Sequence, residues 1–97
     1  MPTARRTQTA FEALGYAPEE AEHLRIRADL MLALAALIAE RGWTQAEAAR
    51  TLGVTQPRVS DLLRGKIDRF SIDTLVHLLA QAGADVTFKV RRRRSAT

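Results

Sequence analysis

The sequence contains no cysteine, which excludes disulfide bonds and thiolate metal sites and fits a reducing compartment. Charged residues interrupt every apolar stretch, and none approaches the roughly 18 consecutive apolar residues that a membrane-spanning helix needs. The first 15 residues include two arginines but no apolar region after them, so we expect no secretory signal. These absences predict a cytoplasmic protein without a membrane anchor.

Patterns typical of catalysis or metal binding are also missing. His23 and His77 fall in different predicted helices, and we assign neither of them to a metal site. Ser60 has no nucleophile-elbow sequence around it, and no pair of carboxylates marks a cleft. We therefore predict that the protein is not an enzyme and uses no cofactor.

Positive charge is present in excess and is unevenly placed. The 97 residues, 46% of them hydrophobic, predict one domain with one modest core, and the net charge of +4 favours polyanions, above all nucleic acid. Residues 18–41 carry five acids and three bases, whereas residues 42–70 carry five bases and three acids. Residues 84–97 add five bases against one acid. The basic excess therefore lies in the second half of the chain.

Start and stop signals divide the middle of the chain into four predicted helices. The first spans residues 18–41, with proline at its first position, acids in its first turn and a glycine just past its end. Its leucines after residue 30 fall on more than one face, so we expect protein on all sides of its second half. Thr44, Thr55 and Ser71 are the predicted N-caps of the other three helices, and Glu47 completes a capping box with Thr44.

The two ends of the chain differ from this helical middle. Residues 1–17 are expected to be irregular or to contain a short strand at "TQTAF", and residues 91–97 to form a disordered basic tail, leaving 18–90 as the domain. Residues 84–90 alternate apolar and polar side chains, which predicts a strand. Because a lone strand is not stable, we expect it to pair with "TQTAF" or with the same segment of a second copy. The predicted dimer contacts are Val86, Thr87, Phe88 and Val90.

A glycine separates the second and third predicted helices, although the sequence around it would suit one continuous helix. Two short helices joined by a tight glycine-containing turn cross at about 90–120°, the helix-turn-helix arrangement, and this frees the second helix to enter a DNA major groove. Gly53 supplies the turn conformation. Small or apolar residues occupy the positions where the helices would meet: Ala48, Ala49, Leu52, Val54, Val59 and Leu62.

Residues 44–66 resemble the helix-turn-helix of the Xre/Cro family of phage-repressor-like proteins. Eight residues fit at fixed offsets without a gap: Gln45, Ala49, Gly53, Thr55, Gln56, Val59, Leu62 and Gly65. The resemblance implies a mainly α, lambda-repressor-like fold. One departure is plain, because the phage repressors continue into a fifth helix where this chain has the predicted strand.

The whole chain, from "FEALGY" to "GADVTFKV", also resembles small HigA-type antitoxins. In that group the protein represses its own operon and neutralises a RelE-like ribonuclease, which implies a nucleoid-associated bacterial homodimer on a pseudo-palindromic operator. The acids of residues 19–29 would then suit a basic toxin. Two alternatives remain open: a stand-alone or phage-type regulator without a toxin, and a protein-interaction module without DNA binding.

The third predicted helix divides into a core face and a DNA-reading face. Val59, Leu62 and Leu63 point together at about 100° per residue and are expected in the core. Gln56 suits an adenine edge and Arg58 a guanine edge. The predicted DNA-binding residues, which include contacts implied by the resemblance, are Gln45, Thr55, Gln56, Pro57, Arg58, Ser60, Asp61, Arg64 and Lys66.

Two of these assignments have alternatives. Asp61 either accepts a hydrogen bond from cytosine or orients Arg58, three residues away on the same helix. The basic residues of this region could instead form an ordinary solvated face: Arg58, Arg64, Lys66 and Arg69.

Overall fold

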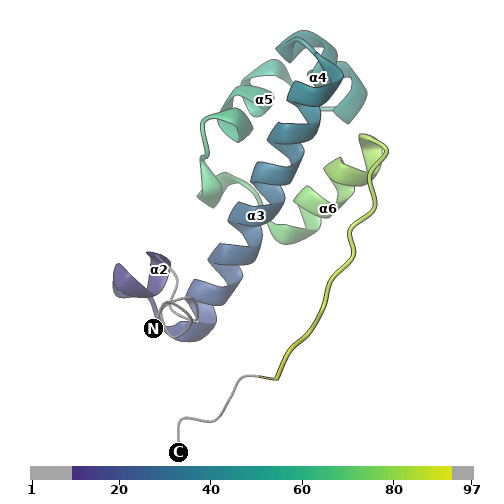
Figure 1. Ribbon diagram of the computed structural model, residues 1–97. Helices are drawn as coiled ribbons and strands as arrows, with labels where there is room; N and C mark the ends of the chain where they lie inside the picture. Colours follow the sequence, from purple (N-terminus) through teal and green to yellow (C-terminus); the bar gives the residue numbers. More distant parts are fainter. Residues whose placement is uncertain (1–9, 93–97) are drawn as a thin grey trace, which may run out of the picture.

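The computed structural model describes residues 10–92, and within them the regular structure is entirely helical. The elements are α2 (Ala10–Ala13), α3 (Pro18–Arg41), α4 (Gln45–Leu52), α5 (Gln56–Leu63), the 3-10 helix η1 (Ile67–Arg69) and α6 (Ile72–Gln81). The long helix α3 forms the axis of the molecule (Figure 1). It packs against α6, α5 and η1, and α2 packs against its first turns.

The predicted helix starts are confirmed, because the chain satisfies the first backbone N–H groups locally. Thr44 Oγ1 accepts from the Glu47 N–H at 3.1 Å, and Glu47 Oε1 accepts from the Thr44 N–H at 2.9 Å, which completes the capping box. Thr55 Oγ1 accepts from the N–H three residues on at 3.3 Å, and Ser71 Oγ accepts from the Thr74 N–H at 3.1 Å. These caps fix where α4, α5 and α6 begin.

One core joins one side of α3 to the three helices that follow it. Leu34 and Leu75 are fully buried at its centre, and Phe70, between η1 and α6, is 2% exposed. The positions predicted for the α4–α5 contact are confirmed: Ala48, Ala49, Leu52, Val59 and Leu62 are buried and Val54 is half-buried. The core thus fixes how α5 is held against the rest of the molecule.

Two predictions about burial are wrong. Leu32 in the second half of α3 is 69% exposed, because α4, α5 and α6 cover only one side of that helix. Leu63 is 40% exposed rather than in the core, since α5 ends there and the chain turns away through Gly65.

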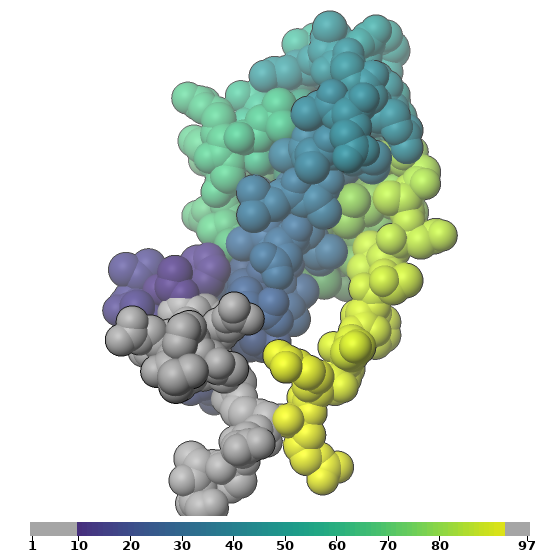
Figure 2. Space-filling view, viewed as in Figure 1, coloured from purple at the N-terminus to yellow at the C-terminus, as the bar shows by residue number. Residues whose placement is uncertain are grey.

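The predicted strands are not formed within residues 10–92. Residues 84–92 have no regular secondary structure, because no other segment of the described chain pairs with them. They run from the end of α6 along the surface towards the end of the molecule that carries α2 (Figures 1 and 2). Ala10 and Phe11 of "TQTAF" begin α2 instead, where the Phe11 and Tyr16 rings meet edge to face at 6.3 Å. Residues 7–9 and the basic tail from residue 93 lie outside the described residues.

Candidate nucleic-acid interface

The turn between α4 and α5 has the conformation that the glycine predicts. Gly53 lies in the left-handed region at φ 72° and ψ 33°, and it ends α4. The next N–H, of Val54, donates to the Ala49 carbonyl at 3.0 Å and closes the turn. Helix α5 therefore starts in a new direction with its first turn at the surface (Figure 1).

The predicted DNA-binding residues divide into two groups by exposure. Gln45, Thr55, Gln56, Pro57 and Arg64 are exposed, whereas Arg58, Ser60, Asp61 and Lys66 are half-buried. Gln45 opens α4, while Gln56 and Pro57 open α5, so most of the exposed predicted residues lie at the N-termini of two helices. The hydroxyl of Thr55 accepts the cap bond of α5.

Arg58 folds back onto the protein. Its guanidinium carbon lies 4.3 Å from the centre of the Phe70 ring, and its Nη1 donates to the Arg69 carbonyl oxygen at 2.7 Å. A hydrogen bond from a charged donor contributes about 1.5–3 kcal/mol and a cation–π contact at an exposed site about 0.5–1 kcal/mol. Since Arg58 is only half-buried, the lower ends of these ranges apply. These two contacts hold the Arg58 side chain against the protein.

Asp61 contacts a residue that the sequence analysis did not assign to it. Its Oδ2 accepts from Arg69 Nη1 at 3.1 Å, and the two side chains are 20% and 55% exposed, respectively. The alternative in which Asp61 orients Arg58 is therefore wrong, because the Arg58 side chain contacts Phe70 and the Arg69 carbonyl instead. Arg69 reaches α5 from η1, a short helix that no start signal in the sequence predicted.

Arg27 is a second residue that sequence reasoning missed. From α3 its Nη1 donates to the Ile67 carbonyl oxygen at 3.1 Å, and its Nη2 lies 3.0 Å from His23 Nδ1. The segment 67–69 is thus held from both sides, by Arg27 at its first residue and by Arg58 at its last. The sequence gives no distinct signal for this contact, because Arg27 lies in the polar half of α3, between Arg25 and Asp29.

A protein family and a solved structure are similar to this chain. A family described as "Helix-turn-helix domain" matches residues 14–91. A solved chain provisionally described as an XRE family transcriptional regulator is 36% identical, with a TM-score of 0.72 over 80% of this chain and 91% of that one. The chain belongs to the XRE-type helix-turn-helix family. No match was found among curated proteins.

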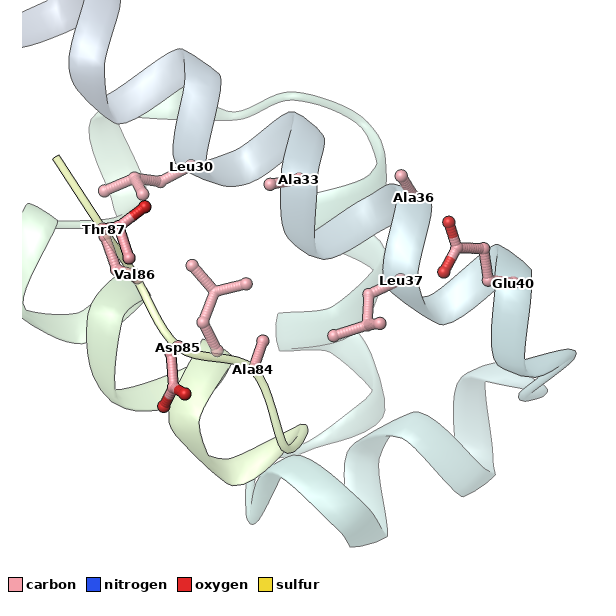
Figure 3. A pocket seen from close by; sticks show the side chains of 10 residues that line it. Leu30, Ala33, Ala36, Leu37, Glu40, Ala84, Asp85, Val86 and Thr87 are labelled. Atoms are coloured by element: carbon pink, nitrogen blue, oxygen red, sulfur yellow. The ribbon is translucent and has the colours of Figure 1, made fainter.

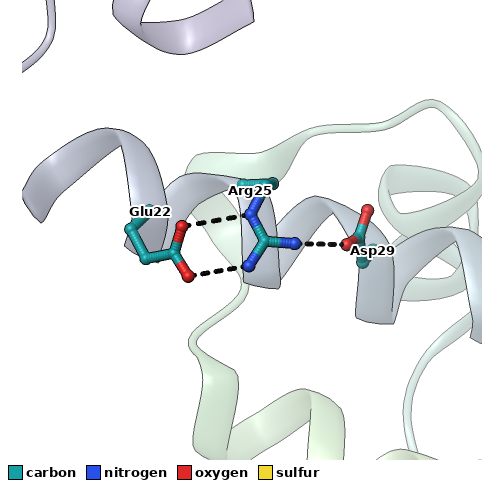
Figure 4. A network of polar contacts seen from close by, with 3 residues as sticks. All are labelled: Glu22, Arg25 and Asp29. Carbon is teal, nitrogen blue, oxygen red and sulfur yellow. Dashed lines mark hydrogen bonds and ion pairs between the residues drawn. The ribbon is translucent and has the colours of Figure 1, made fainter. Parts of the chain in front are cut away.

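The acidic half of α3 in this XRE-type protein is partly neutralised by its own arginine. Arg25 contacts the Glu22 carboxylate at 2.7 and 3.1 Å and Asp29 Oδ2 at 3.0 Å (Figure 4). The hydrogen bonds to Glu22 raise the pKa of the Arg25 guanidinium, and the charge of Asp29 adds to that effect. Glu19 and Glu20 in the first turn are exposed. The predicted acidic surface is therefore reduced mainly to the first turn of α3.

The C-terminal segment of the XRE-type domain borders a groove beside α3. The groove has a volume of about 350 Å³ and lies between α3, Leu79 and residues 84–87, with Leu30 and Leu37 pointing into it (Figure 3). Of the predicted dimer contacts, Val86 is half-buried against the core, whereas Thr87, Phe88 and Val90 are exposed. In the described part of the chain, every helix is too short or too polar to span a membrane.

Proposed function

We propose that this XRE-type protein is a sequence-specific transcriptional repressor that inserts α5 into the major groove of double-stranded DNA. The observation that carries the proposal is the exposure of Gln56 and Pro57 at the start of α5, which begins just after the left-handed turn at Gly53. Residues in the first turn of a recognition helix approach the bases most closely. Gln56 can donate to and accept from an adenine edge, and Pro57 can contact a thymine methyl group.

Contacts to the DNA backbone would fix the register of α5. Arg64 is the C-cap of α5 and Lys66 follows Gly65, so two positive charges lie at the end of the helix opposite to Gln56. Gln45 and the N-terminus of α4 offer N–H donors, which suit phosphate oxygens. Together these groups account for the basic excess of residues 42–70 in terms of a polyanionic partner.

A selection from randomised DNA tests this proposal and identifies the operator sequence in the same experiment. The full chain would be incubated with labelled duplexes that contain about 20 randomised base pairs, enough for two half-sites. We expect an enriched sequence that the wild type binds more tightly than a shuffled duplex, with affinity that falls as salt rises. Absence of both enrichment and salt-dependent binding would leave the protein-interaction module as the better description.

We further propose that the repressor acts as a homodimer joined through residues 84–90. This segment is extended, has no paired segment in the described chain, and exposes Phe88 and Val90 by 86% and 85%. Pairing with a second copy about a two-fold axis would satisfy its free backbone groups. Two α5 helices spaced by about 34–36 Å would then fit a pseudo-palindromic operator.

The narrower proposal is that the repressor is also the antitoxin of a HigBA-like pair. Its support is the resemblance in sequence together with exposed Glu19 and Glu20 near exposed Leu14 and Tyr16, a combination that suits a basic protein partner. Expressing the adjacent reading frame with and without this chain tests it. A neighbour that arrests growth alone and is rescued by co-expression would support the antitoxin. A harmless neighbour that does not bind the chain would indicate a stand-alone regulator.

A further inference from the structure

The segment that follows the recognition helix is fastened to it by a closed set of contacts. Arg58 donates to the carbonyl oxygen of Arg69, and the side chain of Arg69 returns to Asp61. Arg58 and Asp61 are three residues apart and so lie one turn apart on the same side of α5. The Arg58 guanidinium lies over the ring of Phe70, which is buried in the core.

The two arginines, Arg58 and Arg69, differ in how far their guanidinium groups are open to a further partner. The guanidinium of Arg58 has one face on the Phe70 ring and one nitrogen on a carbonyl, and the residue is half-buried. The Arg69 side chain is 55% exposed and has one nitrogen on Asp61. A guanidinium carries five N–H donors in a fork, so Arg69 keeps donors free for a second partner.

The ion pair with Arg69 also changes the electrostatic effect that Asp61 would have on DNA binding. An unpaired carboxylate beside a DNA-reading helix would repel phosphates, but the ion pair with Arg69 offsets its charge. The pair at the same time holds the Arg69 guanidinium alongside the second turn of α5.

We propose that Arg69 supplies the DNA-contacting guanidinium on this flank of α5, and that Arg58 and Asp61 are positioning residues that hold it there. The proposal rests on the proposed function, since it names which arginine contacts the duplex. Arg58 acts on the backbone of residue 69, and Asp61 acts on its side chain. DNA affinity should therefore depend on Arg58 only through Arg69.

A double-mutant cycle on the full chain tests this dependence. Fluorescence anisotropy would measure binding to the duplex enriched by the wild type and to a shuffled duplex, between about 50 and 200 mM salt. We expect Arg69→Ala to weaken binding to the enriched duplex roughly 5-fold or more. If the contact is to a phosphate, the salt slope also falls by about 0.9. Arg58→Ala should weaken binding similarly, and the double variant should bind no more weakly than Arg69→Ala alone.

Arg64→Ala provides the matched control, because Arg64 is exposed at the C-cap of the same helix and takes no part in the Arg58–Arg69 contacts. Its effect should multiply with that of Arg58→Ala. If instead Arg58→Ala removes a guanine preference at one position, and its effect multiplies with that of Arg69→Ala, Arg58 reads a base and the inference is wrong. Far-ultraviolet circular dichroism at the binding temperature would verify that each variant is folded.

Asp61→Ala separates positioning from charge without removing either arginine, because it removes the carboxylate that accepts from Arg69. Electrostatics alone predicts tighter binding to every duplex by the same factor, because a negative charge is lost near the phosphates. Positioning predicts that the ratio of affinities, enriched to shuffled, falls several-fold because Arg69 is released. A wild type that binds no duplex would overturn the proposed function and this inference together. Binding that is unchanged in Arg69→Ala would overturn this inference alone.

Discussion

Replacing Gly53 by alanine measures the cost of the turn that separates α4 from α5. The φ angle of +72° places this residue in the left-handed region, which costs a residue with a Cβ roughly 1–2 kcal/mol. An added Cβ would meet only Gln81 Nε2 at 3.8 Å, an ordinary van der Waals contact, so no steric cost is added. We therefore expect Gly53→Ala to lower the free energy of unfolding by about 1–2 kcal/mol.

Thermal and urea unfolding, followed by circular dichroism at the helix band, would measure this loss. Each kcal/mol corresponds to a decrease in Tm of about 4–8 °C for a domain of this size. Gly53→Asn should lose less, because asparagine tolerates the left-handed region better than alanine. Gly42→Ala is the matched control, since Gly42 ends α3 at φ 66° with nothing within 4 Å of an added Cβ.

Two outcomes would refute this reasoning. A Gly53→Ala variant as stable as the wild type would mean that the turn does not need the left-handed conformation. A loss well above that of Gly42→Ala would mean that the α4–α5 packing, rather than the local backbone, resists the substitution. DNA affinity measured well below both melting temperatures should stay near that of the wild type, because neither substitution changes a proposed contact.

Four further predictions concern the caps, the core, the reading face and the C-terminal segment. Thr44→Ala removes the hydrogen bond from the Glu47 N–H to Thr44 Oγ1, one of the two bonds of the capping box, and should destabilise the fold by about 0.5–2 kcal/mol in urea unfolding. Leu34→Ala should cost about 2–5 kcal/mol, whereas Leu32→Ala, at a position 69% exposed, should stay within about 0.5 kcal/mol of the wild type. Gln56→Ala should reduce discrimination between enriched and shuffled duplexes by about 1–3 kcal/mol, and equal loss on both would assign Gln56 to the backbone. Phe88→Pro should yield monomers in sedimentation at concentrations where the wild type is dimeric, and a monomeric wild type at micromolar concentration would end the dimer proposal.

The helix starts could be predicted from the sequence because each depends on residues close in the chain. Thr44, Thr55 and Ser71 each cap an N–H three residues further on, so the whole interaction lies inside one short window of sequence. The same holds for Gly53, whose conformation depends on its lack of a Cβ. With those signals in place, the α4–α5 contact could be assigned to the small or apolar residues on either side of the turn.

The contacts of Arg58 could not be predicted in the same way. Its partners are Phe70 and the Arg69 carbonyl, 12 and 11 residues further on, and their position depends on η1. That short helix has no side-chain cap and follows Gly65, and its place is fixed by tertiary contacts such as that of Arg27. The residue type of Arg58 predicts a contact with DNA, but the direction of its side chain depends on the folded chain around it.

The predictions for the C-terminal segment and for the apolar second half of α3 both concern the same contact between these two parts of the chain. Helical spacing predicted that protein would surround the second half of α3, and alternation predicted a strand at residues 84–90. Instead, residues 84–87 lie beside α3 as an extended segment, and Leu30 and Leu37 face the groove between them. A period of two requires extended backbone but does not supply a neighbouring strand, and within one chain none is present among the described residues. A second copy paired along residues 84–90 would supply that neighbour. It would also fix both segments over the grooves beside their own α3 helices, and so fix the spacing of the two α5 helices on DNA.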